Sequence, residues 1–371
     1  MHERVIRAAL LVTTTTAALG PSLVQAQGDG LVPTDFYHEV GVGEVAISPD
    51  GALVAFTVTT IDEDQNQRHR EVWLQELRGG RPSDDPFRFT DPTREASAPR
   101  WSPDGRILSF ESRRGGDSDA HSTWFARVTF PGGEAYQING VDAAPVWSPD
   151  GNWIAYVARP TTATDPEATN RDGWIAPDAI SATLSAERFD GRVITTMSYK
   201  RDGTATLLPH PASVPKRQLF VVPVEGGDAV QRTDLPFDVS GPIWSADGER
   251  LYFTGNELED DDHNREATTD IYVVGRESGD AEALTVNPGN DSAPALSPDG
   301  TMLAYLHSRG RGEETDVRVV GLAVDGSFQG IPRNLTGNWD EIPGSPAWTA
   351  AGDAVRFLAG VGGNRHVFEV N

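Results

Sequence analysis

The chain has 371 residues, and its 31 lysines plus arginines against 55 aspartates plus glutamates give a formal net charge of −24. This acidic balance argues against a nucleic-acid backbone or an anionic membrane surface as the main partner. The sequence contains no cysteine, which excludes disulfides, thiolate metal sites, iron–sulfur clusters and a cysteine nucleophile. Its 38 glycines and 26 prolines are typical of many short strands joined by turns.

Residues 1–26 have the pattern of a secretory signal peptide. Arg4 and Arg7 precede a short apolar stretch at residues 8–20, and Val-Gln-Ala at residues 24–26 matches a small-x-small cleavage site. A membrane anchor is the alternative, but it needs about 20 apolar residues and this stretch is shorter. We therefore expect a periplasmic or secreted, soluble protein without a membrane span.

The remainder, residues 27–371, is dominated by one repeated motif, Ser-Pro-Asp-Gly or a variant of it. Successive copies lie 54, 46, 97, 52 and 52 residues apart, and four of these five intervals are near the period of a propeller blade. The copies are ISPDG at 47–51, WSPDG at 101–105, WSPDG at 147–151, WSADG at 244–248, LSPDG at 296–300 and the degenerate WTAAGD at 348–353.

The residues around each motif predict strands. Asp-Gly between two apolar runs favours a hairpin, because glycine adopts positive φ without steric cost and aspartate tolerates the turn. Runs rich in β-branched and aromatic residues follow it, such as LVAFTV at 53–58 and RLYFT at 250–254. About four strands per repeat predict an all-β protein, a β-propeller of WD40- or TolB-like repeats with six recognisable blades, or seven if it is completed beyond the C-terminus.

Several positions recur at fixed places in the repeats. We interpret the recurring tryptophans as core wedges between blades, rather than as a row of ligand-stacking rings, because buried tryptophan mainly supplies apolar area. The recurring aspartates are interpreted as turn formers and not as catalytic carboxylates. A threonine lies eleven or twelve residues before the tryptophan or leucine in four repeats, and a proline lies two residues before it in five. These residues are Trp101, Trp147, Trp244 and Trp348; Asp50, Asp104, Asp150, Asp247 and Asp299; Thr90, Thr233, Thr285 and Thr336; and Pro99, Pro145, Pro242, Pro294 and Pro346.

Two insertions interrupt the array, at about residues 160–215 and 255–270. The first accounts for the 97-residue interval, and we expect a long insertion on one blade, although a degenerate extra blade is the alternative. The second, which contains Asp260-Asp261-Asp262, is dense in acidic residues. It lacks the spacing of a Ca²⁺-binding loop, so a solvated loop is the preferred interpretation.

The repeats, the signal peptide and the insertion together resemble the propeller of the prolyl oligopeptidase family of serine peptidases, in its bacterial dipeptidyl-peptidase and acylaminoacyl-peptidase branches. The segment RVI at 192–194 followed by YKRDG at 199–203, which leads into QLFVVPVEGG at 218–227, is similar to a strand–turn segment of those peptidases. The Ser-Pro-Asp-Gly repeat itself is shared with TolB-like propellers.

The chain departs from that family in its catalytic part. The resemblance implies an α/β-hydrolase domain with a Gly-x-Ser-x-Gly elbow, but the sequence contains no such motif, and the nearest match, residues 116–120, lacks the second glycine. No catalytic residue can therefore be assigned in this chain. The resemblance also implies seven blades. Either the last blade lies beyond Asn371, or six blades close when residues 36–40 or 44–47 supply the missing outer strand.

No cofactor, metal or other binding residue is assigned from the sequence. The eight histidines do not have the spacing of metal ligands. Glu313-Glu314 could hold a substrate amine, as a glutamate pair does in some dipeptidyl peptidases of that family, but its surroundings favour a surface turn.

The sequence thus predicts the non-catalytic propeller of a secreted serine peptidase, which controls the access of peptides to a hydrolase domain supplied in trans or beyond this chain. The alternative is a stand-alone TolB-like periplasmic propeller that binds a protein partner or a small ligand on one face. An enzyme with an unrecognised site is the least favoured hypothesis, because no nucleophile and base are visible.

Overall fold

The computed structural model describes residues 32–113, 122–128, 134–141, 143–160, 215–256, 268–286, 288–310 and 313–371. The expected signal peptide, nearly all of the first insertion and residues 257–267 of the second lie outside this set, as does the near-match at residues 116–120. A short 3-10 helix, η2 (Pro33–His38), precedes the first strand.

The strands form six successive antiparallel units, and each described unit begins shortly before a Ser-Pro-Asp-Gly motif or its variant. Units 1 to 3 contain β1 (Gly41–Ile47), β2 (Leu53–Asp62), β3 (Gln67–Arg78), β4 (Arg81–Pro82) and β5 (Phe87–Arg88); β6 (Ala96–Trp101), β7 (Ile107–Ser112) and β8 (Ser122–Arg127); and β9 (Val146–Trp147), β10 (Trp153–Ala158), β11 (Gln218–Pro223) and β12 (Val230–Gln231). Units 4 to 6 contain β13 (Asp238–Trp244), β14 (Arg250–Asn256), β15 (Thr269–Gly275) and β16 (Glu282–Ala283); β17 (Asn290–Leu296), β18 (Met302–Ser308), β19 (Thr315–Leu322) and β20 (Phe328–Asn334); and β21 (Gly344–Trp348), β22 (Val355–Val361) and β23 (Asn364–Val370).

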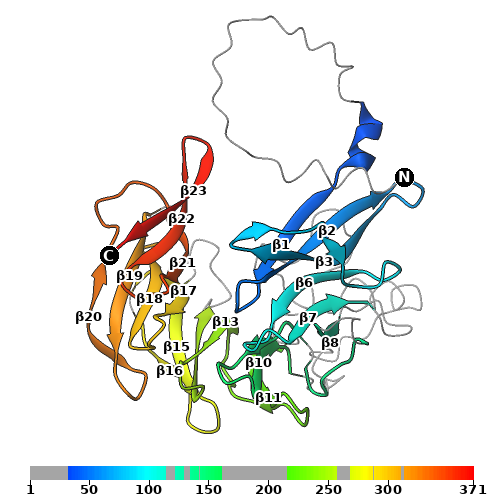
Figure 1. The fold of residues 1–371 in the computed structure, drawn as a ribbon. Helices are drawn as coiled ribbons and strands as arrows, with labels where there is room; N and C mark the ends of the chain where they lie inside the picture. The colour runs from blue at the N-terminus through cyan, green and yellow to red at the C-terminus, as the bar shows by residue number, and fades with distance from the viewer. Residues whose placement is uncertain are drawn as a thin grey trace, which may run out of the picture.

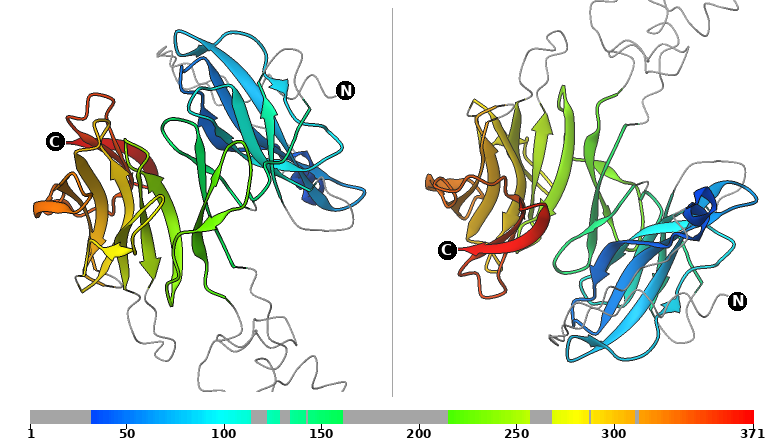
Figure 2. Two further views of the ribbon diagram at one scale, coloured as in Figure 1. Left: turned by 90° about the horizontal axis from the view of Figure 1, so that it is seen from below. Right: turned by 90° about the horizontal axis from the view of Figure 1, so that it is seen from above.

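The units follow one another around an arc, each packed against the next (Figure 1, Figure 2). Apolar clusters fill each junction; one joins Tyr252 and Ile271 of unit 4 to Leu303 and Tyr305 of unit 5. Because successive side chains of a strand point to opposite faces, a middle strand needs apolar residues throughout, and Leu251–Phe253 of β14 are all buried. This confirms the predicted all-β propeller fold; the number of blades in a complete ring stays a prediction.

The inner strand of each unit from 1 to 6, except the short β9, contains a bulge with one residue at positive φ. In four of these strands that residue directly precedes the recurring proline, so the proline marks the point where the inner strand bends. The residues are Glu44, Ala98, Gly241, Ala293 and Ser345, with φ between 50° and 58°.

The arc is open between units 6 and 1. The ribbons of the two units lie apart in Figure 1, and none of the apolar clusters among the described residues joins them. The alternative that residues 36–40 or 44–47 close the ring against the last strand is wrong for this structure. Residues 33–38 form η2, and β1 pairs with β2, with Ile47 opposite Val54, because this segment is the inner strand of its own repeat.

Candidate functional site

The recurring Ser-x-Asp sequence builds the same turn in five units. In unit 1 the Ser48 hydroxyl donates to Asp50 Oδ1 at 2.6 Å and accepts a hydrogen bond from the Leu53 N–H at 2.9 Å. The Ala52 N–H donates to the same carboxylate at 3.0 Å. The arrangement repeats at Ser102, Ser148, Ser245 and Ser297, while Thr349 with Asp353 forms a variant of it.

These hydrogen bonds fix the charge of the turn carboxylates. In all five turns the hydrogen bond from the serine hydroxyl is the largest cause of a lowered pKa of the aspartate, and in four of them the hydrogen bond from a backbone N–H is the second. These aspartates are Asp50, Asp104, Asp150, Asp247 and Asp299. A carboxylate with a lowered pKa is a poor proton donor or acceptor near neutral pH. The interpretation of these aspartates as turn formers, and not as catalytic groups, agrees with this geometry.

The turns also stack on one another around the arc. An added Cβ at Gly105 would lie 3.5 Å from Pro49 Cδ, and one at Gly352 would lie 3.4 Å from Pro298 Cδ. The same contact joins Gly151 to Pro103, Gly248 to Pro149 and Gly300 to Ala246. The six turns therefore form a continuous line on one face of the propeller, and each turn carries an exposed acidic residue toward that face.

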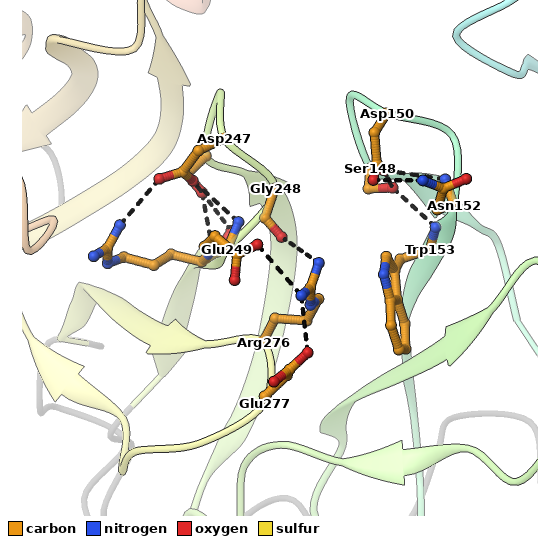
Figure 3. Close-up of polar contacts among 11 residues, drawn as sticks. Ser148, Asp150, Asn152, Trp153, Asp247, Gly248, Glu249, Arg276 and Glu277 are labelled. Atoms are coloured by element: carbon orange, nitrogen blue, oxygen red, sulfur yellow. Dashed lines mark hydrogen bonds and ion pairs between the residues drawn. The ribbon is translucent and has the colours of Figure 1, made fainter.

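Figure 3 shows the polar contacts within unit 3 and within unit 4 where the two units adjoin. Arg276, which follows β15, lies with its guanidinium 4.8 Å from the centre of the Trp153 ring of unit 3. Its Nη2 is 2.9 Å from Glu277 Oε1 and 3.3 Å from Glu249 Oε1, and its Nη1 donates to the Gly248 carbonyl at 3.4 Å. Arg276 is thereby neutralised and holds two units together; this arrangement is an interblade clamp and contains no nucleophile.

The tryptophans occupy the blade junctions as predicted. The indole Nε1 groups of Trp101, Trp244 and Trp348 donate to inner-strand carbonyls of the preceding unit. Trp147 instead packs edge-on against Phe125, with ring centres 5.9 Å apart, and its buried Nε1 has no hydrogen-bond partner among the described residues. The four repeated tryptophans are therefore wedges between units, not an exposed stacking surface.

The hydroxyl of each repeat threonine accepts a hydrogen bond from a backbone N–H of the third strand of its unit, a contact that we call the threonine cap. The N–H of Val72 donates to Thr90 Oγ1 at 3.0 Å, and the N–H of Val317 donates to Thr336 Oγ1 at 2.9 Å. Thr233 and Thr285 accept the N–H groups of Leu219 and Ile271 in the same way. The sequence shows the spacing of these threonines, and the structure explains it.

Unit 5 contains a buried Asp291–His307 pair that the sequence analysis did not identify. His307 Nδ1 lies 2.7 Å from Asp291 Oδ1, and the two side chains are 5% and 1% exposed. Burial, and then the charge of Asp291, raise the pKa of the nearby Tyr305 hydroxyl to about 12. Aligning the repeats would have revealed the pair, because the corresponding cross-strand pair of unit 1 is Val42–Val58.

A second buried charge lies in unit 1. Glu71, 8% exposed, accepts hydrogen bonds from Arg88 Nε at 2.8 Å and from Trp73 Nε1 at 3.1 Å, and His69 Nε2 lies 3.3 Å from its other oxygen. His69, Glu71 and Trp73 lie at alternate positions of β3, but Arg88 joins them only because β5 pairs with β3, and the sequence spacing does not show that pairing. Its charges are paired, so it supplies no free acid or base.

The remaining candidates are placed as follows. Glu313 and Glu314 are exposed at the β18–β19 connection, in agreement with the surface-turn interpretation. Asp260–Asp262 lie outside the described residues. In the described part of the chain, no group of three or more histidines and carboxylates is placed to hold a metal ion. Nor does any helix in that part have the length and apolar character needed to cross a bilayer.

Comparison with solved structures shows which known folds the chain resembles. The chain aligns with the β-propeller domain of the trilobed protease of Pyrococcus furiosus, reported to have an open velcro topology, with a TM-score of 0.55, 14% identity and 89% and 82% of the two chains covered. It also aligns with the acylaminoacyl peptidase of Pyrococcus horikoshii, with a TM-score of 0.59, 16% identity, and 90% and 45% covered. The fold shared with these structures is that of a β-propeller.

Sequence relatives point to particular peptidases. Dipeptidyl-peptidase 5 of Porphyromonas gingivalis is 24% identical over 310 residues, 82% of this chain and 42% of the relative. The uncharacterized peptidase YuxL of Bacillus subtilis is 29% identical over 240 residues, 63% of this chain and 32% of the relative. The chain is homologous to these peptidases and spans less than half their length, which confirms the resemblance seen in the sequence.

No family model matches the chain. The alternative of a stand-alone TolB-like propeller stays a prediction.

Proposed function

We propose that this chain is the non-catalytic propeller portion of a secreted serine peptidase of the prolyl oligopeptidase type. The observation that carries the proposal is the coverage: 82% of this chain aligns with 42% of a dipeptidyl-peptidase 5, and 90% of its fold with 45% of an acylaminoacyl peptidase. The aligned part is the propeller, and the sequence has no Gly-x-Ser-x-Gly elbow of its own.

In this role the propeller controls which substrates reach a hydrolase domain that these residues do not contain. Its units form an arc with an opening between units 1 and 6 (Figure 1). In this proposal a short or unfolded peptide passes between these two units, whereas a folded protein does not. The acidic residues of the stacked turns place negative charge on one face, which favours the positively charged amino end of a peptide.

The proposal is tested by capture from the source organism. An antibody against the propeller would precipitate the native protein, and a fluorophosphonate probe, which labels the reactive serine of serine hydrolases, would be applied to the precipitate. We expect no labelling of the purified 371-residue chain and labelling of a longer species or of a co-precipitated hydrolase. A precipitate that contains the chain and no labelled hydrolase would contradict the proposal and favour a stand-alone propeller.

Secretion is a separate part of the proposal, based on residues 1–26. Sequencing the amino terminus of the native protein tests it. A chain that begins at Gln27 in the periplasm or medium supports the expectation, whereas an intact Met1 in the cytoplasm overturns it.

A further inference from the structure

A glutamate of unit 1 contacts unit 2 at the bulges of the two inner strands. Glu44 is the bulge residue of β1, and its Oε2 accepts the N–H of Ala98, the bulge residue of β6, at 2.8 Å. The same oxygen accepts the hydroxyl of Thr57, a residue 2% exposed, at 2.6 Å. A carboxylate oxygen is thus bound by a backbone N–H of one unit and a buried hydroxyl of the other, and hydrogen bonds to an ionised acceptor are the stronger kind.

The junction of units 4 and 5 repeats both donors. Thr254 lies opposite the residue directly before the bulge of β13, as Thr57 does at the bulge of β1. The bulge residue of β17 is Ala293, with a φ of 50° against 53° for Ala98. Because these two bulges have the same register and nearly the same φ, the Ala293 N–H is oriented as the Ala98 N–H is, toward the preceding unit.

The acceptor is what differs between the two junctions. Gly241, the bulge residue of β13, stands at the position of Glu44 and brings no carboxylate. An added Cβ at Gly241 would lie 3.9 Å from Thr254 Oγ1 and within 4 Å of no other described residue apart from its chain neighbours. In the described part of the chain no side chain accepts the N–H of Ala293, and Gly241 and Ala293 are both exposed. A carboxylate from solution therefore has access to both donors.

The buried hydroxyl of Thr254 has only weaker acceptors close by. Thr254 is 6% exposed, and its Oγ1 donates to the Ser240 carbonyl at 3.1 Å and lies 2.9 Å from the Ser240 hydroxyl. Both distances are longer than the 2.6 Å between Thr57 Oγ1 and the Glu44 carboxylate. A neutral carbonyl is a weaker acceptor than a carboxylate, so a carboxylate competes for this hydroxyl.

This donor pair is particular to units 4 and 5 among the junctions that follow them. The next bulge, at Ser345 of β21, again presents a backbone N–H to the preceding unit, but the position equivalent to Thr254 in unit 5 is Leu306, which offers no hydroxyl. On the unit 5 side of the proposed site, Asp291 is 1% exposed and contacts His307 at 2.7 Å. Its negative charge opposes a second carboxylate, so we expect the binding to be weak.

We propose that the Ala293 N–H and the Thr254 hydroxyl bind a carboxylate of a peptide, either its carboxyl terminus or an acidic side chain. One carboxylate oxygen accepts both donors, as Glu44 Oε2 accepts the Ala98 N–H and the Thr57 hydroxyl between units 1 and 2. The choice of a peptide as the carrier rests on the proposed function, whereas the carboxylate chemistry rests on the comparison of the two junctions.

Three tripeptides serve as probes and are added to the full chain while the Ala293 amide is followed by NMR. Acetyl-Ala-Ala-Glu-amide carries only a side-chain carboxylate, acetyl-Ala-Ala-Ala only a carboxyl terminus, and acetyl-Ala-Ala-Gln-amide neither. We expect a saturable shift of the Ala293 amide with at least one of the two acids and none with the neutral peptide, and the acid that binds identifies the source of the carboxylate. Thr254→Val should weaken this binding about tenfold, because a hydrogen bond to a charged group is lost.

The site itself is tested by Gly241→Glu, which reproduces the residue of unit 1. Gly241 has a φ of 58° and Glu44 one of 50°, so a glutamate suits this backbone, and its carboxylate should occupy both donors and abolish the shift. Gly241→Ala is the matched control, because units 2 and 5 have alanine at the bulge, and it should bind as the parent does.

Three results would overturn the proposal: no shift with either acid, an equal shift with the neutral peptide, or unchanged binding in the Gly241→Glu variant. If that variant does not fold, the three peptides on the parent chain decide. None of these readouts needs a hydrolase domain, so a failure of this proposal is distinguishable from a failure of the proposed function.

Discussion

Units 5 and 6 are neighbours with the same repeat pattern, but their surroundings differ. Unit 5 lies between units 4 and 6, and its third strand is paired with β20, so Leu303, Tyr305 and Val317 are fully buried. Unit 6 packs against unit 5 through Val355, Phe357 and Ala359, while Leu358 and Val367 on its other face are exposed. The same strand pattern therefore buries both faces of a unit where a neighbouring unit covers each face and an outer strand pairs with the third strand, as in unit 5.

The largest expected effect comes from the Asp291–His307 pair, which only unit 5 contains in this register. Replacing Asp291→Ala leaves a buried histidine without its partner, and we expect a loss of about 3 kcal/mol in the free energy of unfolding. Urea denaturation measures it. The double variant Asp291→Val with His307→Val reproduces the Val42–Val58 pair of unit 1 and should recover most of that loss. A single variant as stable as the parent would show that the pair contributes nothing.

Units 5 and 6 can be compared directly at two equivalent valines, Val317 and Val367. Val317→Ala removes buried methyl groups and should cost about 2 kcal/mol, whereas Val367→Ala, at a site 67% exposed, should change stability by less than about 0.5 kcal/mol. Thermal and urea unfolding of both variants give the two values. Equal losses would mean that the face of unit 6 is covered in solution.

The threonine cap of unit 5 is tested by Thr336→Val. The N–H of Val317 would then be buried without an acceptor, which should cost about 1–2 kcal/mol. Thr336→Ser keeps the hydroxyl and serves as the control. Native-state hydrogen exchange should show faster exchange at the Val317 amide in the valine variant alone; unchanged exchange would contradict the capping role.

The smallest effect concerns the acidic turns. Ser297→Ala removes the main cause of the lowered pKa of Asp299, so that pKa should rise toward its ordinary value of 3.8. Because the folded-state pKa of Asp299 is depressed, its contribution to stability is present above the ordinary value and is lost as the pH falls through the folded-state pKa. The variant should lose less stability over that acid range. Carboxyl NMR titration measures the pKa, and an unchanged Asp299 would contradict the assignment.

The repeat spacing was enough to predict the all-β propeller, the wedge tryptophans and the turn aspartates, because each depends on local sequence recurring at one period. The Asp291–His307 and Glu71–Arg88 pairs are not part of the repeated pattern; the first shows itself only when the repeats are aligned strand by strand, and the second not at all. Their members lie 16 and 17 residues apart and meet only through strand register. The place of residues 41–47 was likewise hidden, because their sequence is compatible with an outer strand until β1 is seen to pair with β2.

The central claim, that this chain is the propeller of a serine peptidase, is tested most directly by the size of the native protein in its source. Detection with an antibody against the propeller, followed by intact mass measurement and fluorophosphonate labelling, gives the answer. The account predicts a labelled species larger than 40.0 kDa by about the mass of a hydrolase domain, or a chain in a stable complex with a labelled hydrolase. A species slightly below 40.0 kDa, shortened only by residues 1–26 and free of any labelled partner, would contradict it.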